Sequence, residues 1–124
     1  ATIMKVVNRQ NPIEVWGDGK DIRDFIHIDD FVRACIMVME KVDEYNVYNV
    51  GSGTGKSVND VLFNCMDIEN YKTDVVYNSD KPSMIPIRLL DVSKIKEEVG
   101  FETEISLKNG LKSTIEWYKE NKDE

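Results

Sequence analysis

Two arginines are the residues of this chain whose chemistry is easiest to assign. Arg23 and Arg88 each fall on a short predicted strand. A planar guanidinium donates two parallel hydrogen bonds to phosphate oxygens and stays charged when partly buried, so two of them brought together would clamp an anion. The alternative is a pair of surface ion pairs, with Arg23 on Asp24 or Asp18 and Arg88 on Asp91. Each would contribute under about 1 kcal/mol to stability.

The stretch from Gly17 to Asp30 has to position Arg23. Gly17 and Gly19 permit positive φ, so we expect the chain to reverse between residues 13–16 and 22–28 as an antiparallel hairpin. Asp29 or Asp30 is expected to cap a helix that runs from about residue 30 to residue 41. Helical spacing predicts that this helix is buried through five apolar positions: Phe31, Val32, Cys35, Ile36 and Met39.

Strands and helices alternate along the rest of the chain. We expect strands at residues 47–50, 74–77 and 87–90, and helices at residues 1–9, from about 58 to 66, at 94–99 and at 106–121. The last helix should bury Leu107, Leu111, Ile115 and Tyr118. The pattern predicts an α/β fold with a small partly parallel sheet, one antiparallel hairpin and about four to five helices.

The segment Val50-Gly-Ser-Gly-Thr-Gly-Lys-Ser57 resembles a phosphate-binding P-loop but has the wrong spacing. A Walker A loop needs four residues between its first Gly and the Gly-Lys pair, and Gly51 leaves only three. A shorter ring of N–H groups cannot close around a phosphate. We therefore expect a tight turn with Ser57 as the helix N-cap, rather than the nucleotide site of a phosphotransferase.

Composition limits the class of protein. A length of 124 residues fits a single domain spanning 1–124, and no apolar run is long enough for a membrane span. The net charge of −7 argues against a broad nucleic-acid-binding surface. Cys35 and Cys65 are expected to be reduced core thiols, which favours the cytoplasm. His27, the only histidine, is expected to be structural, and no metal ligand set is predicted.

Three segments carry a resemblance to a known family. They are Val15-Trp-Gly-Asp-Gly-Lys-Asp-Ile-Arg-Asp-Phe-Ile-His-Ile-Asp-Asp30, Tyr48-Asn-Val-Gly-Ser-Gly53 and Pro86-Ile-Arg-Leu-Leu-Asp91. In this order they resemble the C-terminal, substrate-binding part of NAD(P)-dependent nucleotide-sugar epimerases and dehydratases, which are extended short-chain dehydrogenases/reductases. The resemblance covers nearly the whole chain.

The resemblance implies roles for five residues. Arg23 and Arg88 match basic residues that bind the pyrophosphate of the nucleotide sugar. Trp16 matches a substrate-contacting Trp in the GDP-fucose synthase branch of the family, a buried packing role being the alternative. Lys81 and Ser83 lie in a segment that faces substrate in that branch, although Ser83-Met84 replaces its usual Asp-Gly.

The resemblance also implies what lies elsewhere. The chain has neither a Gly-rich dinucleotide fingerprint nor a Tyr-x-x-x-Lys pair, so we expect it to hold no catalytic or cofactor-binding residue. NAD or NADP would be bound by an N-terminal Rossmann lobe that is absent here. The resemblance also allows a homodimer of the complete enzyme. The rival classes are a P-loop-like phosphate binder, which the Gly spacing disfavours, and a non-enzymatic α/β interaction module, which the absence of nucleotide binding would favour.

Overall fold

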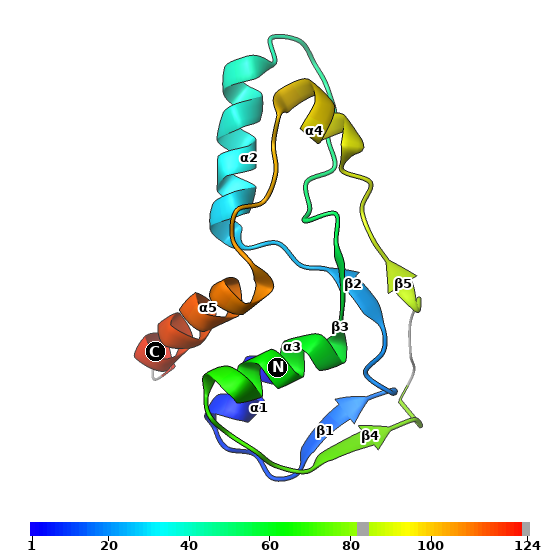
Figure 1. Cartoon of the computed structure of the whole chain (residues 1–124), viewed down its shortest axis with the longest axis vertical. Helices are drawn as coiled ribbons and strands as arrows, with labels where there is room; N and C mark the ends of the chain where they lie inside the picture. The colour runs from blue at the N-terminus through cyan, green and yellow to red at the C-terminus, as the bar shows by residue number, and fades with distance from the viewer. Residues whose placement is uncertain (82–84, 123–124) are drawn as a thin grey trace.

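A computed structural model describes residues 1–81 and 85–122 of the chain. Figure 1 shows an elongated arrangement, with α1, α3, β1 and β4 at one end, α2 and α4 at the other, and β2, β3 and β5 between them. The described residues form α1 (Thr2–Val7), β1 (Ile13–Trp16), β2 (Ile22–Asp24), α2 (Ile28–Lys41), β3 (Gly55–Ser57), α3 (Val58–Ile68), β4 (Val75–Asn78), β5 (Ile87–Arg88), α4 (Ser93–Val99) and α5 (Leu107–Asn121). The predicted α/β class is confirmed.

The strands form two separate sheets. β1 pairs in parallel with β4, while β2 lies between β3 on its antiparallel side and β5 on its parallel side. The predicted hairpin between residues 13–16 and 22–28 is therefore wrong. Gly17 and Gly19 adopt the expected positive φ, 72° and 71°, but a turn of this length does not by itself decide which strands pair. β2 leaves β1 and pairs with β3 and β5, and it ends at Asp24 rather than Ile28.

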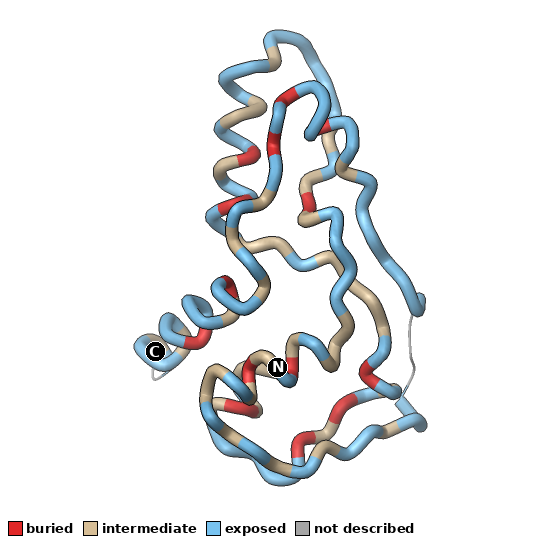
Figure 2. Tube along the Cα trace, viewed as in Figure 1, coloured by how far each residue is buried: buried red, intermediate tan, exposed pale blue. Residues whose placement is uncertain are grey.

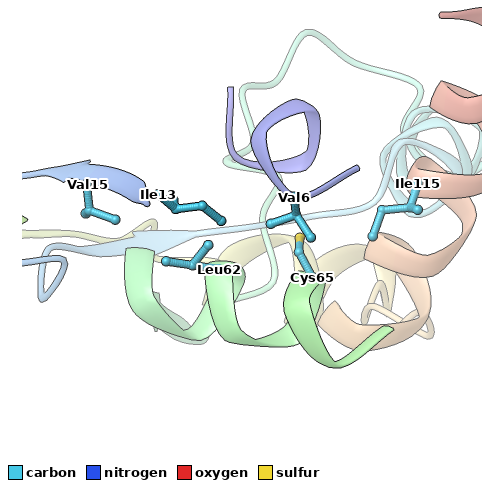
Figure 3. Close-up of a cluster of buried hydrophobic side chains, with 6 residues drawn as sticks. All are labelled: Val6, Ile13, Val15, Leu62, Cys65 and Ile115. Carbon is cyan, nitrogen blue, oxygen red and sulfur yellow. The ribbon is translucent and has the colours of Figure 1, made fainter. Parts of the chain in front are cut away.

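Two clusters of buried apolar side chains hold these elements together. The first joins α1, β1, α3 and α5 through Val6, Ile13, Val15, Leu62, Cys65 and Ile115. In Figure 3 Val6 points toward Cys65, and Ile13 lies close to Leu62. The second cluster joins α2 and α4 through Ala34, Ile95, Val99 and Phe101. The core is therefore divided between the two ends of the molecule.

Several helix ends follow the sequence prediction. Ser57 caps α3 in a capping box, accepting a bond from the Asp60 backbone N–H while the Asp60 carboxylate accepts one from the Ser57 N–H. Ser106 caps α5. Gly100 ends α4 with φ of 77°, a left-handed conformation that other residues adopt only at a cost. No helix within the described residues is long and apolar enough to cross a membrane.

The predicted burial of α2 is wrong. Its buried residues are Asp30 and Ala34, whereas the expected core positions face solvent (Figure 2). We call these positions, together with Ile28, the α2 apolar face: Ile28, Phe31, Val32, Cys35, Ile36 and Met39. Met39 is 82% exposed and Ile28 63%. Spacing identified the apolar side of the helix correctly, but α4 packs against the other side.

The strand expected at residues 47–50 does not form, although the segment lies beside α4. Lys94 donates to the Val47 carbonyl at 3.1 Å, and the Asn49 side chain donates to the Asp91 carbonyl, also at 3.1 Å. Because no strand among residues 1–81 and 85–122 pairs with this segment, its strand propensity has no ladder to join. The short strand of this region is instead Gly55–Ser57.

Candidate functional site

Arg23 and Arg88 lie next to each other although 65 positions separate them in the sequence. They are Cα partners on the parallel strands β2 and β5. Registered partners on neighbouring strands point to the same face of a sheet. The structure therefore brings together the two arginines that the sequence singled out.

Arg23 is held in place by the backbone around it. Its Nη1 donates to the carbonyl oxygens of Ile22 at 2.7 Å and Ile85 at 2.8 Å, and its Nη2 lies 3.1 Å from an Asp21 carboxylate oxygen. The alternative ion pair of Arg23 with Asp24 or Asp18 does not form, and Asp21 is its partner instead. Alternation along β2 sends the Asp24 side chain to the opposite face from Arg23.

Arg88 is exposed and less restrained. Asp91, its partner in the alternative interpretation, accepts instead from the Ser93 N–H at 3.0 Å and from the Ser93 hydroxyl. These bonds hold the pKa of Asp91 below its ordinary value. Among the residues described, Arg88 makes no hydrogen bond or ion pair, so its guanidinium is available to a ligand.

Trp16 and Lys81 form a second pair near the ends of β1 and β4. The Lys81 ammonium lies 5.6 Å from the centroid of the Trp16 ring, within the range of a cation–π contact. Trp16 is 62% exposed, so the alternative of a buried packing Trp is wrong. Ser83, the remaining predicted site residue, lies outside the described residues.

A hollow of about 330 Å³ lies next to these two pairs. Lys81 and Asp21, the ion-pair partner of Arg23, both line it, together with Gly17, Asp18, Lys20, Ser79 and Pro86. A larger hollow of about 540 Å³ lies along β4, but no Lys or Arg among the described residues lines it. Because an anionic ligand needs cationic donors, the smaller hollow is the better candidate for a phosphate group.

The Gly-rich turn at residues 51–55 already binds an anionic group of the chain itself. The Asp24 carboxylate accepts bonds from the Ser52 N–H at 2.7 Å, the Ser52 hydroxyl at 2.6 Å and the Gly53 N–H at 3.0 Å. These are donors that a P-loop would offer to a phosphate. The contacts support the structural role that the spacing predicted for this turn.

His27 is structural, as predicted, and it also performs the capping expected of Asp29 or Asp30. Its Nδ1 accepts from the Asp29 N–H at 3.3 Å, and its Nε2 lies 3.0 Å from the Ser113 hydroxyl. α2 therefore begins at Ile28, ahead of both aspartates, and the predicted Asp cap is wrong.

Asp30 is a structural residue that the sequence interpretation missed. Only 2% of it is exposed, and it accepts from the Glu104 and Ile105 N–H groups and from Arg33 at 2.9 Å. Burial alone would raise the pKa of Asp30, but these bonds together hold it below its ordinary value. The available signal was an Asp and an Arg three positions apart on one helix.

The chain resembles known enzymes in both sequence and structure. Residues 1–51 match the model of the NAD dependent epimerase/dehydratase family. The structure superposes on UDP-glucose 4-epimerase from Thermotoga maritima, solved with UDP-glucose, with a TM-score of 0.85 and 32% identity, covering 96% of this chain and 38% of the other. The resemblance to the nucleotide-sugar epimerases and dehydratases is confirmed. The predicted likeness to the C-terminal part of extended short-chain dehydrogenases/reductases is confirmed with it.

Two curated relatives are similar to the chain over most of its length. GDP-L-fucose synthase of Escherichia coli is 36% identical over 120 residues, which are 90% of this chain and 37% of the relative. UDP-glucuronate 4-epimerase of Thermodesulfobacterium geofontis is 32% identical over 119 residues, 95% of this chain and 36% of the relative. The chain thus spans little more than a third of the length of these relatives.

Proposed function

We propose that this chain is the nucleotide-sugar-binding part of an NAD(P)-dependent epimerase, dehydratase or reductase. The observation that carries the proposal is the registered pair of Arg23 and Arg88 on one sheet face. Two guanidinium groups at neighbouring positions suit the two linked phosphates of a nucleotide sugar. The family relationship supports the same ligand class.

The two arginines differ in how firmly their guanidinium groups are held. The backbone bonds of Arg23 hold one guanidinium in a fixed position before a ligand arrives, which lowers the entropy lost on binding. Arg88 can adjust to the second phosphate. Lys81 lines the hollow of about 330 Å³, and together with Trp16 it would contact the remainder of the nucleotide sugar.

The chemistry itself would occur on a separate part of the enzyme. In this proposal a Rossmann lobe outside the chain binds NAD or NADP, which exchanges a hydride with a sugar carbon. This chain supplies binding energy away from the reacting carbon and orients the sugar. The α2 apolar face supports the proposal, because a large exposed apolar surface marks a site of contact with another lobe or partner.

A narrower assignment is a GDP-fucose synthase-like protein. Two GDP-L-fucose synthases, from Escherichia coli and Arabidopsis thaliana, are 36% and 29% identical to the chain. We propose this branch as the second candidate, with the cytoplasm as the compartment and a homodimer as the assembly of the complete enzyme. A preference for GDP-sugars over UDP-sugars would support it.

Calorimetric titration of the chain with UDP-glucose and GDP-mannose tests the proposal. We expect saturable binding that Arg23→Ala and Arg88→Ala each weaken about tenfold to a hundredfold, since a hydrogen bond to a charged group is worth about 1.5 to 3 kcal/mol. Lys72→Ala is the matched control, because Lys72 is an exposed cation in the connection between α3 and β4. Absence of binding, or equal affinity of all variants, contradicts the proposal and favours an interaction module.

A further inference from the structure

A third cation lies in line with the two arginines. Lys56, on β3, is the Cα partner of Arg23 on the antiparallel side of β2, just as Arg88 is its partner on the parallel side. The strand order β3-β2-β5 therefore places Lys56, Arg23 and Arg88 at the same level across the three-stranded sheet. We call these three residues the cationic row.

Two observations place the side chain of Lys56 on the face of the arginines. Registered partners share a face of a sheet. Lys56 and Phe25 also line one hollow of about 390 Å³, and Phe25 follows Arg23 by two positions, which is the spacing of residues that point to the same side. The cationic row therefore presents three positive side chains in one direction.

No hydrogen bond or ion pair among the described residues holds the Lys56 ammonium in place, although its charge acts on the carboxylate of Asp60. Lys56 is exposed. The neighbouring carboxylate of Asp60 is engaged in the capping box, where it accepts from the Ser57 N–H at 2.8 Å. Asp21 is the carboxylate paired with the central guanidinium.

The geometry points to Lys56 as a third phosphate-binding residue, an inference that rests on the proposed function. Neighbouring strands are about 4.8 Å apart, so the row spans roughly 10 Å at the backbone. The restrained Arg23 lies at its centre, with one flanking cation on each side. A ligand with two linked phosphates can engage both flanking cations together with Arg23, whereas one phosphate engages Arg23 and a single neighbour.

The test is titration of the chain with inorganic pyrophosphate and with inorganic phosphate, followed by NMR chemical shifts. Four variants are compared: Lys56→Gln, Lys56→Arg, Arg88→Gln and the control Lys72→Gln. We expect Lys56→Gln to weaken pyrophosphate binding about threefold to tenfold and phosphate binding less than twofold. Lys56→Arg should restore pyrophosphate affinity, because it keeps the charge.

The outcomes separate this inference from the proposed function. If Arg88→Gln weakens pyrophosphate binding and Lys56→Gln does not, Lys56 is a solvated lysine and the inference is wrong while the proposed function stands. If Lys56→Gln lowers the affinity for pyrophosphate and for phosphate equally, the inference is also wrong, because the loss of one positive charge would explain both results. If pyrophosphate does not bind, or binds all variants alike, the proposed function and this inference fail together.

Discussion

The guanidinium of Arg23 donates a hydrogen bond to the carbonyl oxygen of Ile85 at 2.8 Å, which links β2 to the residues just before β5. Arg23 thus has a structural role that its neighbour Arg88 lacks. This difference allows the stability effect of each arginine to be separated from its effect on ligand binding.

We predict that Arg23→Ala lowers the free energy of unfolding by about 1 to 2 kcal/mol, because the carbonyls of Ile22 and Ile85 lose a hydrogen-bond donor and the ion pair between Arg23 and Asp21 is removed. Arg88→Ala should change it by less than about 0.5 kcal/mol, as expected for an exposed side chain. Urea unfolding followed by circular dichroism measures both. Equal destabilisation by the two substitutions would contradict the assigned contacts of Arg23.

Asp30 should be the carboxylate on which the fold depends most. We predict that Asp30→Asn costs about 3 kcal/mol, because the buried negative charge beside Arg33 is lost and an amide NH2 replaces one of the two oxygens that accept from Arg33 and from the Glu104 and Ile105 N–H groups. Asp29→Asn, in the same helical turn but exposed, is the control and should have little effect. Thermal unfolding of both variants provides the comparison.

The same carboxylate predicts a pH dependence. The pKa of Asp30 is lower in the folded state than the ordinary value of about 3.9 for an Asp carboxyl. The stability that the Asp30 carboxylate contributes is therefore fully present above about pH 3.9. The contribution is lost as the pH falls through the folded-state pKa. The free energy of unfolding should therefore decrease below about pH 4 in the parent chain, with a shallower decrease in Asp30→Asn. Identical slopes would exclude Asp30 as the source.

Asp24 should be needed for the turn at residues 51–55. We predict that Asp24→Ala destabilises the chain by about 2 kcal/mol, since the N–H groups of Ser52 and Gly53 lose their acceptor. Added phosphate should not rescue the variant if the turn is purely structural. Stabilisation by phosphate would instead show that the turn can serve as an anion site.

The chain should not bind NADPH on its own. None of its strand-to-helix turns has the Gly spacing that allows a backbone to approach a dinucleotide pyrophosphate, and the Gly-rich turn is bonded to Asp24. Fluorescence titration of NADPH against the chain is the measurement. Saturable binding at micromolar concentrations would contradict the proposed division between this chain and a separate cofactor lobe.

The α2 apolar face should promote self-association. Met39 and Ile36 are 82% and 50% exposed, and apolar side chains on one helix face associate when no other lobe covers them. We predict that the double substitution Ile36→Glu, Met39→Glu shifts the chain toward monomer in sedimentation velocity. Because neither side chain is buried, thermal stability should change little; a large loss would mean that the face is part of the core.

Local sequence patterns predicted the ends and buried sides of helices, but they did not predict which distant strands pair. The capping role of Ser57, the end of α4 at Gly100 and the buried side of α5 around Ile115 all followed from short sequence signals. The partner of β1 did not, because Ile13 pairs with Val75, and alternation along a strand does not specify which distant strand will join it.

The residues of the candidate site were predicted from the sequence, but their arrangement was not. Arg23 and Arg88 were identified by chemistry and by family resemblance, but their register could not be inferred without knowing that β2 and β5 are neighbours. Lys56 was missed as a site residue because it was considered only as part of a defective P-loop. The burial of Ala34 in place of Ile36 depended on where α4 packs, which the periodicity of α2 does not encode.

The two sheets are interleaved along the chain. β1 belongs with β4, and β5 belongs with β2 and β3, so each sheet combines strands from before and after the connection at residues 69–74. Each core cluster likewise contains residues from before and after this connection. Ile115 belongs to the first cluster, and Ala34 and Ile95 belong to the second. Cleavage in this connection would leave two peptides that each lack part of every sheet and cluster. Such peptides are suited to fragment complementation, in which neither folds until the other is added.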